Sequence, residues 1–361
     1  MASRSWVRPA VALLALLGPA ASAHAWDRPQ GLGYVDGITY FNDAARASDL
    51  VTVEPIGTSV AGLPIAAVVV TRAARPEDAI RVLVICRQHG HEPGSERAAC
   101  QVVDAWRHDA DPKTVRRLRR VAFILIPYAN PDGAVADRRG NAHGLDLNRD
   151  WQARTQPETQ AVERAFLEWQ PHLVLDCHVF DPQDPNGPWA GEARDLLEAY
   201  QRGDHVSDTA RALQRALARR QNLTGWPVRE SYSDRGFRLS LAHRHFAANH
   251  GAPSLLFECG RRQVEPFAAL FRNTLAELGD DPGRWKPALD NLRGLRSWRA
   301  PERRNEPIAL PLYLRPVRLR RAQEPAGSGD FRPPVTVPLA GIAGAAMVTY
   351  ALVGLLRRRR S

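Results

Sequence analysis

Five apolar runs rich in β-branched residues are the feature that most restricts the fold of this chain. They alternate with stretches of helical periodicity and lie at 66–71, 81–86, 121–126, 172–176 and 254–257. Near-continuous apolar runs of this length are typical of central strands buried on both faces. Strands that alternate with helices favour parallel connections. We therefore predict an α/β fold with a mixed, largely parallel central sheet and helices on both faces.

The predicted helices lie at Ser95–Trp106, Pro157–Trp169, Asp208–Gln221 and Pro266–Leu278. The second of these has Thr155 as a possible cap and a proline in its first turn, as helix starts often do. The length of the body at 26–292 suits one large α/β domain as well as two small ones, and we predict a single domain. A later run, Leu310–Leu319, is compatible with an edge strand.

Both ends of the chain have the features of an exported, membrane-anchored protein. Residues 1–25 have the layout of a signal peptide: arginines, a short apolar stretch, and an Ala-His-Ala cleavage pattern ending at Ala25. Residues 335–356 carry no charge, are long enough for a transmembrane helix, and precede a basic cytoplasmic tail at 357–361. The pattern also resembles a cleaved C-terminal sorting signal. Either reading places the body outside the cytoplasm, in the periplasm or at the cell surface.

The formal charge of +10 is concentrated near the membrane. The signal peptide, the terminal arginines and the basic, Pro-rich segment at 293–334 carry all of the excess, which leaves about −2 for the body. This distribution favours contact with anionic lipid, in addition to the lipid around the C-terminal helix, and excludes a nucleic-acid partner. A solvated basic linker explains it equally well.

Four cysteines, Cys86, Cys100, Cys177 and Cys259, lie in the body. In an oxidising compartment they permit zero to two disulfides. Their apolar surroundings are equally compatible with free, buried thiols.

Polar residues follow four of the predicted strands at the point where each strand ends. His89 and Glu92 follow the run at 81–86, and His178 and Glu258 follow the last two runs. The fourth strand, at 121–126, leads to the polar stretch 130–133. Open α/β sheets bind ligands at this edge. Two imidazoles and one carboxylate form the ligand set of a catalytic zinc site, with a position left for water. A pairing of His89 with His91 in place of Glu92 is an alternative.

The order of these motifs resembles the zinc metallocarboxypeptidases of the carboxypeptidase A superfamily. After the His-x-x-Glu pair come Asn-Pro-Asp-Gly at 130–133 and Gly-x-Asp-x-Asn-Arg at 144–149, then the strand-end His and the strand-end Glu. The likeness covers roughly residues 50–280. It implies that His89, Glu92 and His178 hold one zinc ion. It also implies that Glu258 is the general base that takes a proton from a metal-activated water and returns it to the leaving amine.

The same resemblance implies three further roles. Arg139, or its neighbour Arg138, would stabilise the developing oxyanion, and Asn148 and Arg149 would bind the terminal carboxylate of a peptide substrate. A planar guanidinium suits both tasks. The residue types of Asn-Pro-Asp-Gly favour a turn, and we expect this motif to have a structural role.

The sequence thus predicts zinc-dependent hydrolysis of C-terminal peptide bonds of extracytoplasmic peptides. Two alternatives use the same fold: a cell-wall peptide hydrolase or N-acyl-amino-acid deacylase with the same site, and a non-catalytic binding module. The chain departs from the family pattern at His91, where some relatives have Arg, and at Phe180, where an aromatic hydroxyl is expected. Tyr232 is the nearest candidate for the family's mobile tyrosine, with a spacing that fits poorly.

Overall fold

The computed structural model describes residues 33–185, 187, 189–200, 208–233, 239–260, 264–295, 298–301, 305–311 and 314. The predicted signal peptide, the predicted transmembrane helix at 335–356 and the basic tail lie outside these residues, as does most of the segment at 293–334. Within the described part of the chain, no helix combines the length and the apolar character needed to cross a bilayer.

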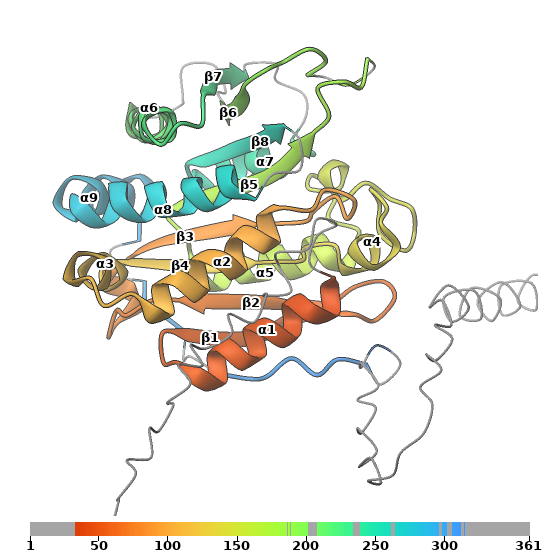
Figure 1. The fold of residues 1–361 in the computed structure, drawn as a ribbon, viewed down its shortest axis with the longest axis horizontal. Coiled ribbons are helices and arrows are strands. Elements are labelled where there is room, and N and C mark those ends of the chain that lie inside the picture. Colours follow the sequence, from red (N-terminus) through yellow and green to blue (C-terminus); the bar gives the residue numbers. More distant parts are fainter. Residues whose placement is uncertain are drawn as a thin grey trace, which may run out of the picture. The chain divides into compact units, whose positions relative to one another are not determined.

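The centre of the molecule is a twisted eight-stranded sheet (Figure 1). Its strands follow the spatial order β1-β2-β4-β3-β5-β8-β6-β7. Their bounds are β1 Val51–Thr58, β2 Pro64–Val70, β3 Ile80–Ile85, β4 Val121–Ile126, β5 Leu173–Phe180, β6 Asp195–Tyr200, β7 Val228–Ser233 and β8 Ser254–Gly260.

Four strands in the middle of the sheet, β4, β3, β5 and β8, are parallel to one another. An antiparallel pair, β1 and β2, extends the sheet beyond β4, and β6 joins β8 in the antiparallel direction with β7 parallel to β6. The four parallel strands correspond to four of the five apolar runs, and the fifth run forms β2. The predicted mixed, mostly parallel α/β sheet is therefore confirmed.

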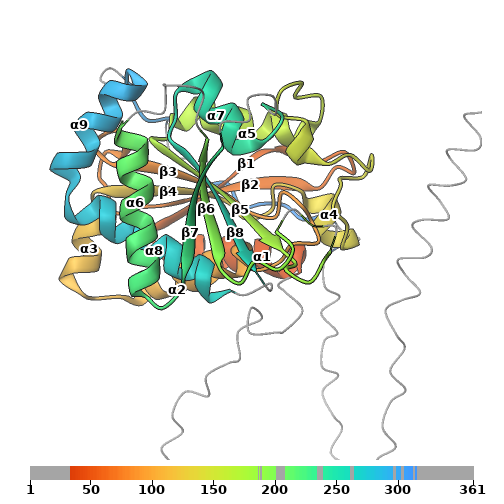
Figure 2. The same ribbon diagram turned by 90° about the horizontal axis from the view of Figure 1, so that it is seen from above.

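Helices cover both faces of the sheet. Figure 2 shows α5 and α7 on one side and α1, α2 and α8 on the other. Helix α6 contributes Leu213 and Leu217 to the same core as α2 and α8. The bounds are α1 Tyr34–Ala47, α2 Ser95–His108, α3 Pro112–Leu118, α4 Pro131–Ala136, α5 Pro157–Trp169, α6 Asp208–Leu223, α7 Ala242–His250, α8 Glu265–Asp280 and α9 Pro282–Arg293.

Side chains of β3 alternate between two hydrophobic cores, although every residue of the strand is buried. Val82 and Val84 pack into the core under α1, α2 and α8, whereas Leu83 and Ile85 pack into the core under α5 and α7. The alternation is the period of two that any strand has. It decides which side chains of each strand reach which face.

The winding of the sheet reverses beside β3. The chain passes from β3 through α2 to β4 on one side, and then returns through α5, on the opposite face, to β5 on the other side of β3. In open α/β sheets, the carboxyl ends of the strands at such a reversal are where ligands bind. Here the reversal lies between β3 and β5, the strands that lead to His89 and His178.

The structure differs from the predictions at several boundaries. Strands β5 and β8 continue past 176 and 257, so that His178 and Glu258 lie inside the strands near their ends. Residues 310 and 311 form no strand, although Leu310–Leu319 was compatible with one, and the rest of that run, apart from residue 314, lies outside the described residues.

The chain after α9 returns to the first strand and helix. The Glu306 amide donates to the Val53 carbonyl at 2.8 Å. Asn42 and Ile308 exchange two hydrogen bonds, of 2.8 and 2.9 Å, and Ile308 is buried in the core. These contacts attach residues 305–308 to the same folded unit as the sheet.

Candidate metal centre

A tightly held loop connects β3 to α2 and carries the first two proposed ligands. Arg87 begins it with a left-handed φ of 51°. Its guanidinium donates to Glu96 Oε1 at 2.9 Å and to the carbonyl of Gly90, while the Gly94 amide donates to Glu96 Oε2 at 2.8 Å. Glu96 is fully buried. Removing either member of a buried ion pair leaves an uncompensated charge, so this pair fixes the loop strongly.

The same loop packs directly on α4. A Cβ atom on Gly90 would lie 2.0 Å from the carbonyl carbon of Gly133, so only glycine fits. Asn130 caps α4 by accepting from the Gly133 amide at 2.8 Å, and its amide group donates to the carbonyl of Gln88 at 3.3 Å. The Asn-Pro-Asp-Gly motif therefore supports the metal loop and does not itself reach the ligands.

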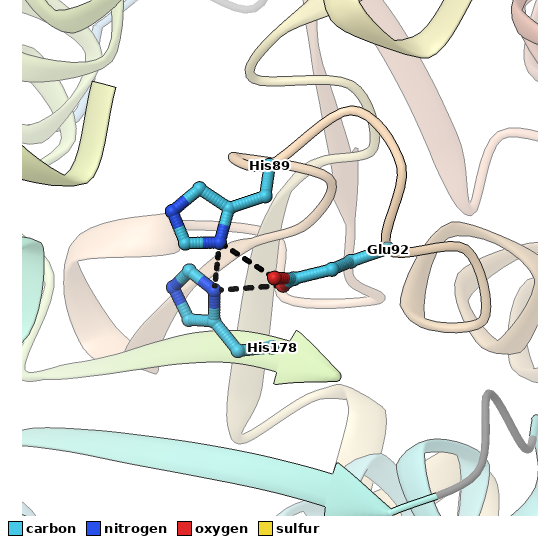
Figure 3. A group of neighbouring side chains, drawn as sticks. All are labelled: His89, Glu92 and His178. Atoms are coloured by element: carbon cyan, nitrogen blue, oxygen red, sulfur yellow. Dashed lines mark hydrogen bonds and ion pairs between the residues drawn. The ribbon is translucent and has the colours of Figure 1, made fainter. Parts of the chain in front are cut away.

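His89, Glu92 and His178 meet at one point (Figure 3). His89 Nδ1 lies 2.7 Å from Glu92 Oε1, and His178 Nδ1 lies 3.0 Å from Glu92 Oε2. The two Nδ1 atoms are 3.1 Å apart. All three side chains are buried. The pairing of β3 with β5 thus brings His178 to Glu92 and His89, which lie 86 and 89 positions earlier in the chain.

The far nitrogen of each imidazole faces a carboxylate. His89 Nε2 lies 3.0 Å from Asp146 Oδ1, and His178 Nε2 lies 3.0 Å from Asp176 Oδ1. Ionised carboxylates only accept hydrogen bonds, so rings that are neutral and donate from Nε2 to Asp146 and Asp176 would present their Nδ1 lone pairs to Glu92 and to each other. Two lone pairs and a carboxylate then converge with no hydrogen between the nitrogens. This arrangement suits a cation, and the donor set fits zinc.

The charges around this point agree with that conclusion. Burial opposes ionisation of Glu92, but the two imidazoles beside it hold its pKa well below the usual range. Burial likewise opposes a charged His178, yet Asp176 and Glu92 raise the pKa of that imidazole well above its usual value. The buried group of carboxylates therefore favours positive charge at its centre.

Glu258 lies beside His178 because the two residues are register partners in the parallel pair β5 and β8. Partners in neighbouring strands project from the same face of the sheet. Burial raises the pKa of Glu258 to about 7; the nearby Glu92 carboxylate adds to this, and His178 opposes it. A carboxyl group that titrates near neutrality can both accept and return a proton.

Arg139, and not Arg138, lies at the rim of the ligand cluster. Its guanidinium contacts Asp146 Oδ2 at 2.9 Å and Glu92 Oε1 at 3.5 Å, and 46 % of the side chain is exposed. Arg138 is exposed, and its backbone amide bonds to the carbonyl of Gly133. His91, the alternative ligand, is outside the cluster, with its ring centroid 6.3 Å from that of His89.

Asn148 and Arg149 come from the short 3-10 turn Leu147–Arg149. Asn148 Nδ2 lies 3.2 Å from His178 Nε2, and its Oδ1 accepts from the first amide of α7, that of Ala242, at 2.9 Å. Its amide group is thus engaged within the protein. Arg149 donates to the Asn148 carbonyl, and nearly half of its side chain is exposed. Of these two side chains, only that of Arg149 is open to solvent and able to bind a substrate carboxylate.

The structure adds positioning residues that carried no role in the sequence prediction. Asp146 and Asp176 orient the two imidazoles. Gln88 Nε2 donates to Asp176 at 3.2 Å, and the Gln88 side-chain oxygen accepts from the Trp151 indole. A signal for Asp176 was present, because residues two apart in a strand share a face and Asp176 precedes His178 by two.

Other anticipated features lie away from this centre or take no part in it. Tyr232 is in β7, at the edge of the sheet and separated from β8 by β6. Phe180 ends β5 and packs against Gly260. All four cysteines are free and buried, which removes the disulfide reading.

Comparison with known proteins agrees with this geometry. Residues 39–222, just over half of the chain, match the model of the family described as zinc carboxypeptidase. Carboxypeptidase 2 of Trichophyton rubrum is 27% identical over 101 residues, which are 28% of this chain and 18% of that protein. Carboxypeptidase SOL1 of Arabidopsis thaliana is 31% identical over 132 residues, 32% of this chain and 26% of that protein. The matches thus span about a fifth to a quarter of these relatives.

Solved structures show the same fold at lower identity. A metallo-carboxypeptidase from Burkholderia cenocepacia superposes with a TM-score of 0.59 at 21% identity, covering 70% of this chain and 71% of that one. Thrombin activatable fibrinolysis inhibitor gives a TM-score of 0.59 at 13% identity, with 76% and 80% covered.

Proposed function

The chain belongs to the zinc carboxypeptidase family, and from this premise we propose that it hydrolyses the C-terminal peptide bond of peptides outside the cytoplasm. The observation that carries the proposal is the convergence of His89, Glu92 and His178 with Glu258 beside them. Three protein ligands that leave a coordination position open, next to a carboxylate with a pKa near neutrality, are the parts that metal-assisted hydrolysis needs.

His89, Glu92 and His178 would hold the zinc ion. When bound, zinc supplies Lewis-acid chemistry: it makes water more acidic and polarises a carbonyl oxygen. With that ion bound, Asp146 and Asp176 would accept the Nε2 hydrogens of the two imidazoles, so that the Nδ1 lone pairs are directed at the metal position.

Glu258 acts as the proton carrier. Its carboxylate takes a proton from the attacking water and then delivers one to the nitrogen of the leaving amino acid, so the group returns to its starting state. Burial raises the pKa of Glu258 to about 7, and a nearby dication would favour the ionised, basic form before attack.

Arg139 and Arg149 supply the two positive charges that the reaction uses outside the ligand set. Arg139 lies within 3.5 Å of Glu92, where its guanidinium can stabilise the negative charge that develops on the carbonyl oxygen. Arg149 is solvent-accessible and can bind the terminal carboxylate through two parallel hydrogen bonds. Asn148 holds Arg149 and the start of α7 in place and completes the carboxylate-binding turn.

A pair of peptides that differ only at the C-terminus tests the proposal. The purified chain should hydrolyse the peptide with a free carboxylate and lose nearly all turnover on the C-terminally amidated one, because Arg149 has no anion to bind. Release of the terminal amino acid is measured by chromatography. Equal turnover of both peptides would instead indicate an amide or cell-wall peptide hydrolase acting through the same site.

A matched variant separates catalysis from binding. Glu258→Gln keeps the shape of the side chain but removes its basicity, so it should retain zinc and lose hydrolysis by a factor of roughly 10² or more. Zinc without hydrolysis in the unaltered chain would favour a binding module.

The location outside the cytoplasm rests on the sequence alone, through the signal-like residues 1–25 and the uncharged stretch at 335–356. We propose that the chain is exported and anchored in the membrane by that stretch. The same free-carboxylate peptide, added to intact cells, should then be hydrolysed as fast as by broken cells. Hydrolysis only after lysis would contradict this location.

A further inference from the structure

A second cluster of two imidazoles and one carboxylate lies between α5 and α7. Glu163 projects from α5, and its two oxygens each face a different histidine of α7. His245 Nε2 lies 2.9 Å from Oε2, and His250 Nε2 lies 2.8 Å from Oε1. The three donor atoms are within 4.8 Å of one another, a property that, in the described part of the chain, only this set and the His89 cluster share.

We propose that Glu163, His245 and His250 form a second site for a divalent metal of the zinc type, with a structural role. Two imidazole nitrogens and a carboxylate oxygen are preferred zinc donors, at about 2.0–2.2 Å from the ion. Donors around one such ion are at most about 4 Å apart. Both distances from histidine to glutamate meet this limit, and the two nitrogens lie within 4.8 Å of each other.

Packing fixes the rings and leaves one side of the cluster open. The His245 ring is 99 % buried, 5.7 Å from Trp151 and 5.1 Å from Phe246 between centroids. His250 lies 4.7 Å from Phe166 and keeps 21 % of its side chain exposed. Water can therefore complete the coordination on the His250 side, and rotation of this partly exposed ring can close the site.

The surroundings of His245 can set the tautomer that a metal requires. The side-chain nitrogen of Asn249, Nδ2, lies 2.8 Å from His245 Nδ1. The oxygen and nitrogen of an amide exchange places by a half turn, so Asn249 can accept a hydrogen from Nδ1. The lone pair of Nε2 is then directed at Glu163. Such an outer hydrogen bond is the usual partner of a metal-binding histidine. Arg154 Nη1, at 3.5 Å from the same nitrogen, is the weaker of the two contacts, so Asn249 has the larger influence on the tautomer.

The charge of the cluster also suits a dication. Burial opposes ionisation of Glu163, but His245 and His250 lower its pKa to about 2, so the carboxylate is charged at neutral pH. With neutral imidazoles the three donor side chains carry a charge of −1, which the Arg154 guanidinium, 3.5 Å from His245 Nδ1, offsets in part.

A metal at this position would fix the orientation of α7. The helix ends at His250, whose carbonyl accepts from Arg293, and begins at Ala242, whose amide bonds to Asn148 beside His178. The second ion would thus hold one end of a helix whose other end borders the catalytic residues, without touching the substrate.

Metal stoichiometry of the full chain tests the proposal. Dialysis against zinc followed by elemental analysis should give two ions per chain, and His89→Ala, which removes a ligand of the first site, should leave one. Glu163→Gln keeps the shape and a hydrogen-bonding oxygen but loses the charge, so it should also bind one, and the combined variant none. In the His89→Ala background, added zinc should raise the melting temperature, and Glu163→Gln should abolish that increase.

The control for folding is the far-UV circular dichroism of each variant, with His250→Gln as a second substitution if Glu163→Gln unfolds. One zinc ion in the unaltered chain, or none in His89→Ala, would show that Glu163 only forms hydrogen bonds between the helices. If the unaltered chain binds two zinc ions but hydrolyses no peptide, the proposed function is contradicted and the second site is still supported.

Discussion

Single residues behind the ligands decide how the metal centre behaves. Asp176 is fully buried, and its Oδ1 is 3.0 Å from His178 Nε2. Burial alone would raise its pKa, but His178 and His243 lower it, so the group is a carboxylate. On the other side of Asp176, His243 lies between Asp176 and Glu198, at 3.6 and 3.2 Å. The ligand His178 is therefore backed by a buried series in which carboxylates alternate with imidazoles.

Replacing Asp176 by Asn should weaken zinc binding by roughly 10- to 100-fold, because the orienting partner of His178 loses its charge. Zinc affinity is measured by competition with a chromophoric chelator. Asp280→Asn is the matched control: Asp280 pairs with Arg117 at the surface, at 2.5 Å, and its loss should leave zinc affinity unchanged. If both variants bind zinc like the unaltered chain, Asp176 has no part in setting the metal site.

At the scale of secondary structure elements, the loop that carries His89 and Glu92 is positioned by a close backbone contact with α4 that leaves no room for a side chain. The loop at 88–94 is held between the Arg87–Glu96 ion pair and α4. Gly90 is the residue at which the loop and α4 touch. A substitution there acts on the whole loop, since the obstacle to a Cβ atom is the backbone of Gly133 and not a side chain that could rotate away.

Gly90→Ala should therefore destabilise the fold by about 1–3 kcal/mol, as overpacking does, and should reduce zinc affinity because His89 and Glu92 move together. Gly283→Ala provides the contrast: it lies in α9, nothing is within 4 Å of the added atom, and alanine favours the helix by up to about 1 kcal/mol. Urea denaturation and chelator competition measure both quantities. Equal behaviour of the two alanine variants would contradict the proposed contact.

The sequence predicts this part of the molecule well where local patterns suffice. Apolar runs locate β3, β4, β5 and β8, and the predicted helix Pro157–Trp169 matches α5 at both ends. The ligands follow from motif order. By contrast, β6 and β7 have no comparable run: β7 is the edge strand, and β6, although buried, is interrupted by the charged Glu198. The link from His89 to Asp146 and the choice between Arg138 and Arg139 depend on how distant loops pack, which sequence spacing does not determine.

Across the whole molecule, α9 is joined to the central sheet by a buried histidine. His172 is fully buried; its Nδ1 accepts from the Arg81 amide at 2.9 Å, and its Nε2 lies 2.8 Å from Asp290 Oδ1. A ring that accepts at Nδ1 and donates at Nε2 is neutral, and both of its nitrogens are satisfied. A second proton would place a hydrogen on Nδ1 against the Arg81 N–H.

This contact makes the stability of the folded chain depend on pH. Burial lowers the pKa of His172 to about 3, although Asp290 opposes that shift, whereas an unfolded histidine titrates near 6.5. Between these values the unfolded chain binds more protons than the folded one. The contribution of His172 is therefore complete above about pH 6.5 and is lost as the pH falls towards 3, by at most about 1.4 kcal/mol per pH unit. Asp290, with its pKa lowered to about 2, stays ionised through this window.

His172→Gln can still accept from Arg81 and donate to Asp290 but does not titrate. The free energy of unfolding, measured by urea denaturation with chelator present from pH 7 to pH 4, should thus fall less steeply for this variant. Parallel pH profiles for the two proteins would show that His172 is protonated in the folded state and that its link to α9 is not the one described.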